Sequence, residues 1–186
     1  MASQSQGRQA ILTLTLLAAV GASLALAPGP DGLCGAYLAA LMLAIAATDA
    51  DRYIIPNELT AAAFALALLR AGTIGPEAGW EAVLWALIRA AAVTLPLLAL
   101  MAGYRRWHGR DGLGLGDVKL AAVIGAWLGW ATIFAVLELA TLTAITVYLI
   151  NALLRKRRLR GAAFLPFGSF LAPAIWLGWL TEALLN

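Results

Sequence analysis

The chain has 186 residues, of which 62% are apolar and only 12% are charged, with a net charge of +3. Soluble domains are about 25% charged, and a soluble globule of this length could not bury so much apolar surface. The composition therefore excludes a soluble protein and a disordered chain. One cysteine and one histidine exclude an intramolecular disulfide and a Cys- or His-rich metal centre. We expect an integral membrane protein with no metal, no other cofactor and no nucleic-acid partner.

Apolar runs follow one another along the chain, separated by short polar breaks. A span needs about 20 largely apolar residues. In chain order the runs cover residues 10–27, 33–48, 59–69, 80–104, 120–154 and 162–180. The run 120–154 would be about 52 Å long as one helix, which is too long for one crossing. We therefore expect a turn near Gly129, and the sequence predicts an all-α, polytopic helix bundle with about seven spans.

Basic residues predict how these spans are oriented. If the N-terminus is cytoplasmic and the spans alternate, all but two of the 13 Lys and Arg residues fall in cytoplasmic segments. Arg70 lies on the outer side, and Arg89 lies inside the fourth span. We expect Arg89 to pair with Glu138, because both lie at a similar depth and an unpaired charge in a membrane is costly. The basic run 155–160 is also suited to binding the headgroups of anionic membrane lipids.

Two acidic residues are expected at the same, cytoplasmic, end of the bundle. Asp49 ends the second span and Asp117 begins the fifth. Ionisable groups at such positions are costly and often functional. Two facing carboxyl groups can share a proton, so that one activates a water molecule while the other protonates a carbonyl oxygen, as in aspartyl proteases. Asp51 is not expected to join this pair, since residues two apart on a helix point to different faces.

Three short motifs accompany these acids. Residues 114–119 read GLGDVK, a GxGDxK pattern that contains Asp117 and whose glycines allow close approach of another backbone. Asp49 is followed by Ile-Pro-Asn at residues 55–57, and a third motif, LPFGSFL, covers residues 165–171. A GxGD pattern alone is weak evidence, whereas the three motifs in this order and on this topology are specific together.

The motifs resemble those of the type IV prepilin leader peptidase family, membrane aspartyl proteases of GxGD type, over about residues 36–180. The resemblance implies that Asp49 and Asp117 form a catalytic dyad. It also implies that the site is shaped by further residues of the motifs and their surroundings, namely Asp51, Pro56, Gly114, Gly116, Lys119, Pro166, Phe167 and Gly168. Ser169 departs from the family, which often has a second proline there.

The resemblance implies an endopeptidase that removes a short, positively charged leader after a glycine, at the cytoplasmic face of the inner (plasma) membrane. Its substrates would be prepilin-like proteins with an apolar N-terminal helix, such as those of tight-adherence (Flp-type) pili. We expect one integral membrane domain, residues 1–186, with an additional N-terminal span at 10–27 and a six-helix peptidase core at 33–185. Long family members carry an N-terminal domain with paired CxxC motifs and N-methyltransferase activity, so this chain is expected to be the short, peptidase-only form.

Two other classes of membrane protein rely on similar acidic residues. Signal-peptide peptidases and presenilins combine GxGD with YD and PAL motifs, which this sequence lacks. A small proton-coupled transporter that uses Asp49 and Asp117 as a relay is the alternative function. Such a carrier is expected to show repeat symmetry and polar residues at mid-membrane depth. Here the two acids are expected at the membrane boundary, and no repeat is visible.

Overall fold

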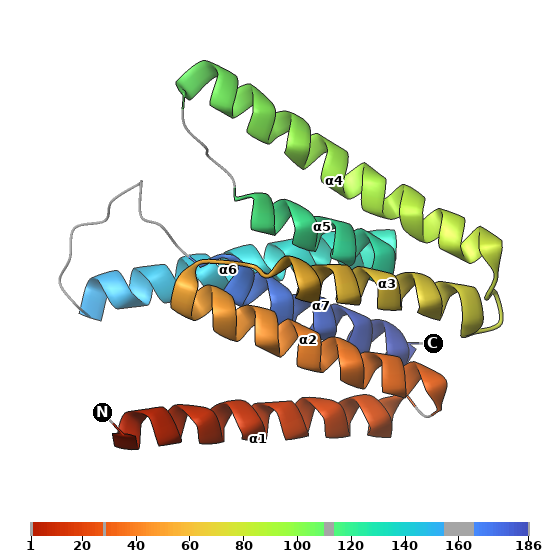
Figure 1. Ribbon diagram of the computed structural model, residues 1–186, viewed down its shortest axis with the longest axis horizontal. Helices are drawn as coiled ribbons and strands as arrows, with labels where there is room; N and C mark the ends of the chain where they lie inside the picture. The colour runs from red at the N-terminus through yellow and green to blue at the C-terminus, as the bar shows by residue number, and fades with distance from the viewer. Residues whose placement is uncertain (1, 28, 110–113, 155–165, 186) are drawn as a thin grey trace.

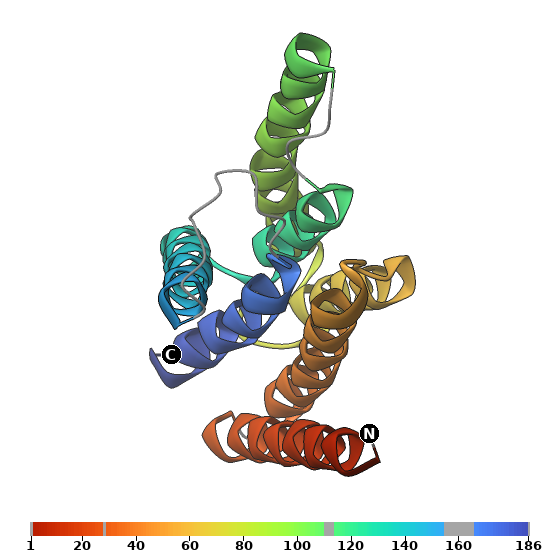
Figure 2. The same ribbon diagram turned by 90° about the vertical axis from the view of Figure 1, so that its left-hand side faces the viewer.

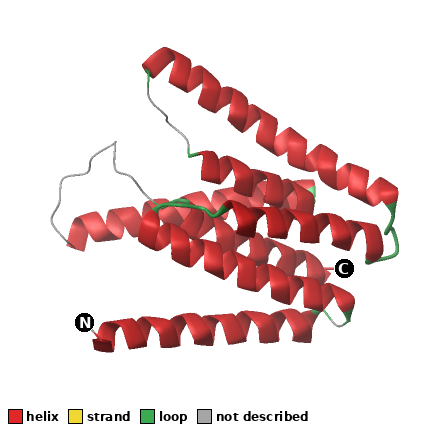
Figure 3. Ribbon diagram, in the orientation of Figure 1, coloured by secondary structure: helices red, strands yellow, loops and turns green. Residues whose placement is uncertain are grey.

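The computed structural model describes residues 2–27, 29–109, 114–154 and 166–185. Every regular element in these ranges is a helix, in the order α1 (Ala2–Leu26), α2 (Pro30–Arg52), α3 (Asn57–Thr73), α4 (Trp80–His108), α5 (Leu115–Trp127), α6 (Trp130–Leu154) and α7 (Gly168–Leu185). Successive helices run in alternating directions (Figure 1), and no strand is present among them (Figure 3). The predicted all-α bundle is confirmed.

Five of the described helices, α1, α2, α4, α6 and α7, are long and apolar enough to cross a membrane. The other two are shorter, with 17 residues in α3 and 13 in α5. The chain breaks between α5 and α6 at Leu128 and Gly129, which confirms the predicted turn. Helices of this number, length and apolar composition are those of a multi-pass membrane protein.

Small residues let the central helices pack closely. A Cβ atom added to Gly35 on α2 would lie 1.8 Å from the ring of Trp179 on α7, so only glycine leaves room for this buried indole. Gly125 on α5 lies against the backbone of α4, where an added Cβ would be 2.6 Å from the Cα of Ala90. Close approach through small residues is a usual way for membrane helices to associate. The core therefore lies where α2, α5 and α7 meet, with α4 resting on α5.

Alternating helix directions collect several helix ends on one side of the bundle. The C-terminal ends of α2 and α4 and the N-terminal ends of α3, α5 and α7 lie on the left-hand side of Figure 1. We call this side the site end and define it by Asp49, Asp117 and Gly168. Figure 2, which views the molecule from that side, shows the C-terminal part of α4 projecting away from the other helices. The buried residues of α4, Ala86 and Ala90, both lie in its first half.

The predicted pairing of Arg89 with Glu138 is wrong. Arg89 on α4 donates a hydrogen bond from Nε to the carbonyl oxygen of Gly125 on α5 at 3.2 Å. The acid whose charge acts on Arg89 is Glu182 of α7. Glu138 is exposed on α6, a helix that packs mainly against α7. A matching depth along two helices does not determine which of their faces meet, so depth alone identified the wrong partner.

Candidate active site

Asp49 lies in the last turn of α2, and only 5% of its surface is exposed. Its Oδ2 accepts a hydrogen bond at 2.8 Å from the backbone N–H of Ser169, the second residue of α7. The first amide groups of a helix have no partners within the helix, and the helix dipole favours negative charge there. The start of α7 therefore holds the Asp49 carboxylate in a defined orientation without a cation.

Asp117 lies in the first turn of α5, one of the two helices shorter than the membrane-spanning ones. Its backbone N–H donates to the carbonyl oxygen of Gly114 at 3.1 Å. A Cβ on Gly114 would lie 3.2 Å from Oδ2 of Asp117, so the glycine leaves this carboxyl group room. Burial, and secondarily the nearby charge of Asp49, raises the pKa of Asp117 to about 6. The fold thus brings the two predicted acids close enough for their charges to interact.

Ile55 packs between the GxGD motif and the third motif. Its side chain is buried, with 8% exposed. A Cβ added to Gly116 would lie 2.9 Å from Cδ1 of Ile55, and one added to Gly168 would lie 2.6 Å from the same atom. The Gly168 Cβ would also lie 3.0 Å from Cγ and Oδ2 of Asp49. Both glycines are therefore needed for α5 and α7 to close around Ile55 beside the Asp49 carboxylate.

Lys119 joins the GxGDxK motif to the Ile-Pro-Asn motif. Its Nζ donates a hydrogen bond to Oδ1 of Asn57, the first residue of α3. Pro56 stands just before the helix in an extended conformation, which suits a residue whose φ is fixed near −65°. Asn57 is a site residue that the sequence reasoning did not identify. The sequence contained one indication of this contact, since Lys119 can donate a hydrogen bond and the side-chain amide of Asn57 can accept one.

The third motif forms the turn into α7. The carbonyl oxygen of Pro166 accepts hydrogen bonds from the backbone N–H and the Oγ of Ser169, at 3.2 and 2.6 Å. Phe167 is half-buried and packs against the core. The family resemblance implied a proline in place of Ser169, and the structure shows the consequence of the serine. A serine supplies the N–H that contacts Asp49, and a proline has none.

Asp51 contacts a different part of the molecule. Its Oδ1 forms an ion pair with Nη2 of Arg8 on α1 at 2.6 Å, and both side chains are about half exposed. Asp49 and Asp51 therefore face different neighbours, as expected for residues two apart on a helix. Among the residues the structure describes, no group of three His, Cys, Asp or Glu side chains could hold a metal ion. Two interacting carboxyl groups such as Asp49 and Asp117 can exchange a proton.

The sequence model of the type IV leader peptidase family matches residues 36–150. This segment contains Asp49 and Asp117 and makes up more than half of the chain. The chain belongs to the type IV leader peptidase family. The third motif and α7 lie beyond the matched residues, so the contact between Ser169 and Asp49 is an observation of the structure alone.

Several prepilin leader peptidase/N-methyltransferases are similar to this chain. The protein from Aeromonas hydrophila is 34% identical over 168 residues, which are 90% of this chain and 56% of that protein. The protein from Burkholderia pseudomallei strain K96243 is 36% identical over 155 residues, 83% of this chain and 48% of its own. The Klebsiella pneumoniae protein is 37% identical over 117 residues, which are 62% of this chain and 49% of that protein. This chain thus spans about half the length of these curated relatives. No solved structure is significantly similar to it.

Proposed function

We propose that this protein is a membrane aspartyl endopeptidase that removes a short basic leader from type IV prepilin-like proteins, including those of Flp-type pili. The observation that carries the proposal is the electrostatic interaction of Asp49 with Asp117 at one end of the bundle. Family membership supports peptidase chemistry, and the names of the relatives support a prepilin substrate. No observation favours the proton-coupled transporter.

The two carboxyl groups have different surroundings, which suits them to different roles. The N–H of Ser169 stabilises negative charge on Asp49. Asp117, with a pKa of about 6, holds the shared proton more readily. We therefore assign Asp49 as the base that takes a proton from water, whose oxygen attacks the carbonyl carbon. Asp117 donates its proton to the carbonyl oxygen. The intermediate then collapses as its C–N bond breaks: Asp49 passes its proton to the departing amide nitrogen, and a hydroxyl of the intermediate returns a proton to Asp117.

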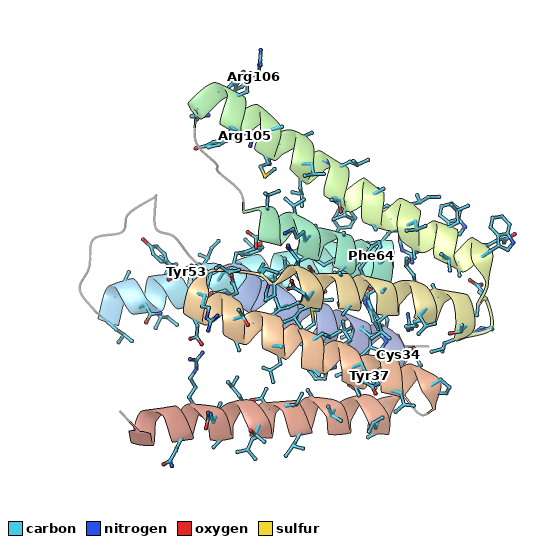
Figure 4. The ribbon with its side chains drawn as sticks, viewed as in Figure 1. Cys34, Tyr37, Tyr53, Phe64, Arg105 and Arg106 are labelled. Carbon is cyan, nitrogen blue, oxygen red and sulfur yellow. The ribbon has the colours of Figure 1, made fainter. Side chains whose placement is uncertain are left out.

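The charge distribution supports a cytoplasmic position for the site end, in the inner membrane. Arg105 and Arg106 lie in the last turn of α4 on that side, and Arg52 lies in the last turn of α2, just before Tyr53 (Figure 4). Basic residues concentrate on the cytoplasmic side of membrane proteins. The leader would reach the dyad from the cytoplasm, while the apolar helix of the substrate stays in the membrane.

The test is cleavage by the purified protein in detergent or lipid vesicles. The substrate is a synthetic peptide with a short lysine-containing leader, a glycine and an apolar helix. We expect two products whose masses correspond to addition of one water molecule at the bond after the glycine, formed without added cofactor. Intact peptide after long incubation, with protein that remains folded, would overturn the peptidase proposal. Proton uptake into vesicles without peptide cleavage would support the transporter instead.

A further inference from the structure

Asp51 binds a cation at the edge of the candidate site, and the proposed dyad does not use it. Its partner, the guanidinium of Arg8, comes from α1, and 50% of the Arg8 side chain and 47% of the Asp51 side chain are exposed. An exposed ion pair of this kind shifts an equilibrium by about fivefold at most. Another cation can therefore displace Arg8 from the Asp51 carboxylate at little cost.

The position of Asp51 relates it to the proposed reaction. It follows Asp49 by two residues on α2, so its backbone lies only about 3 Å further along the helix axis. An extended chain advances about 3.3 Å per residue. The two side chains point to different faces of α2, so a leader with one peptide bond at the dyad reaches Asp51 by passing around the end of the helix. A cationic side chain bound to Asp51 would therefore belong to a residue a few positions before that bond.

The surrounding charges make a dedicated acid necessary for binding a basic segment. The site end carries exposed basic residues, namely Arg52, Arg105, Arg106 and Lys119. Among the described acids at this end outside the dyad, Asp51 and Glu58 are exposed. Of these two, Asp51 already holds a guanidinium. The combined positive charge of these basic residues would repel a basic peptide segment, so binding of such a segment depends on a nearby carboxylate.

We propose that Asp51 is the residue that binds a basic side chain of the leader, and that Arg8 occupies the same carboxylate until the leader replaces it. The inference rests on the proposed function and names a specificity-determining residue for it. The leader is recognised through a Lys or Arg a few residues before the cleaved bond. The α1 helix thereby supplies an internal competitor for the substrate.

The experiment compares two peptides, one with a lysine in the leader and one with glutamine in its place. Asp51→Asn should raise KM for the lysine peptide by about threefold to fivefold with kcat unchanged, and should leave the glutamine peptide unaffected. Arg8→Gln should lower KM for the lysine peptide alone, because it removes the competitor. Asp51→Lys should prefer a peptide with glutamate at the same position.

Glu58→Gln is the matched control, since it removes one negative charge from the same end of the bundle. Its KM values should equal those of the unaltered protein. If Glu58→Gln and Asp51→Asn raised KM equally, or if Asp51→Asn raised KM for both peptides, the effect would come from the overall charge of this end of the bundle. Either result would overturn the inference. Unchanged KM in Asp51→Asn would also overturn it. Failure of the unaltered protein to cleave either peptide would instead refute the proposed function.

Discussion

The two ends of α2 each carry an aspartate, and the two carboxylates have different partners. Asp31, in the first turn, accepts a hydrogen bond from Nε of Arg70 at 2.5 Å. The guanidinium of Arg70 also lies over the ring of Trp127, 5.6 Å from its centroid. Asp49, in the last turn, is contacted instead by the neutral N–H of Ser169. One acid is neutralised by a cation, and the other is only oriented.

This difference distinguishes an acid that stabilises the fold, Asp31, from one that is proposed to take part in the reaction, Asp49. A paired cation compensates the charge of a carboxylate and fixes its position, as Arg70 does for Asp31. An amide donor fixes the position of Asp49 but leaves its negative charge uncompensated, so that it can act on a second acid, Asp117. Both types occur on the same helix. The contacts of each carboxylate, and not the composition of α2, therefore distinguish their roles.

Short of removing a carboxyl group of the dyad, disturbing the orientation of Asp49 should have the largest effect on cleavage. In Gly168→Ala the added methyl group would lie 3.0 Å from Oδ2 of Asp49 and 2.6 Å from Cδ1 of Ile55. We expect kcat to fall about 100-fold, because a displacement of about 1 Å in a reacting group has effects of that size. Gly103→Ala on α4 is the control, since its methyl group would meet nothing within 4 Å. Peptide cleavage kinetics check both, and a Gly168→Ala loss below threefold would contradict the tight contact.

The importance of Gly168 shows what the sequence could and could not predict. Run lengths predicted the helices, and length arithmetic predicted the break at Gly129, because a membrane of fixed thickness limits a span. The motifs predicted which residues meet at the site end. The contact of the Ser169 N–H with Asp49 could not be predicted, because it is made by a backbone group that any residue except proline supplies.

The sequence also could not predict which helix faces contact one another. Arg89 and Glu138 matched in depth, yet Arg89 contacts Gly125 instead. The rotation of each helix about its axis depends on packing against several neighbours at once. The apolar faces of these helices give little indication of it, since lipid and protein interior favour the same side chains.

The rate of cleavage should depend on pH through the protonation of Asp117. Asp117 must carry a proton to donate it, and its pKa is raised to about 6 by burial and by the charge of Asp49. The proton is present below about pH 6 and lost above it. We expect kcat/KM to fall about tenfold per pH unit on the alkaline side. Peptide cleavage from pH 5 to 8, with circular dichroism to verify folding, is the measurement. A constant kcat/KM over this range would refute the role of Asp117 as the acid.

The smallest effect is expected at the opposite end of α2. Asp31→Asn removes the carboxylate from Arg70, and both side chains are little more than a quarter exposed. We expect the free energy of unfolding to fall by about 1–2 kcal/mol, while kcat of the folded protein stays unchanged. Thermal unfolding in detergent measures the first quantity. Combining Asp31→Asn with Arg70→Gln should destabilise the protein no further than Arg70→Gln alone, which also removes the contact with Trp127, and additive losses would contradict a direct pair.

The most direct test of the central claim asks whether Asp49 and Asp117 act as one unit. The measurement is the cleavage rate of Asp49→Asn, Asp117→Asn and the double variant, with Asp31→Asn as the matched control for loss of an aspartate. We predict that each single change lowers kcat at least about 1,000-fold, that the double variant is no slower, and that Asp31→Asn keeps full activity. Normal cleavage by either single variant, or losses that multiply in the double variant, would contradict the account.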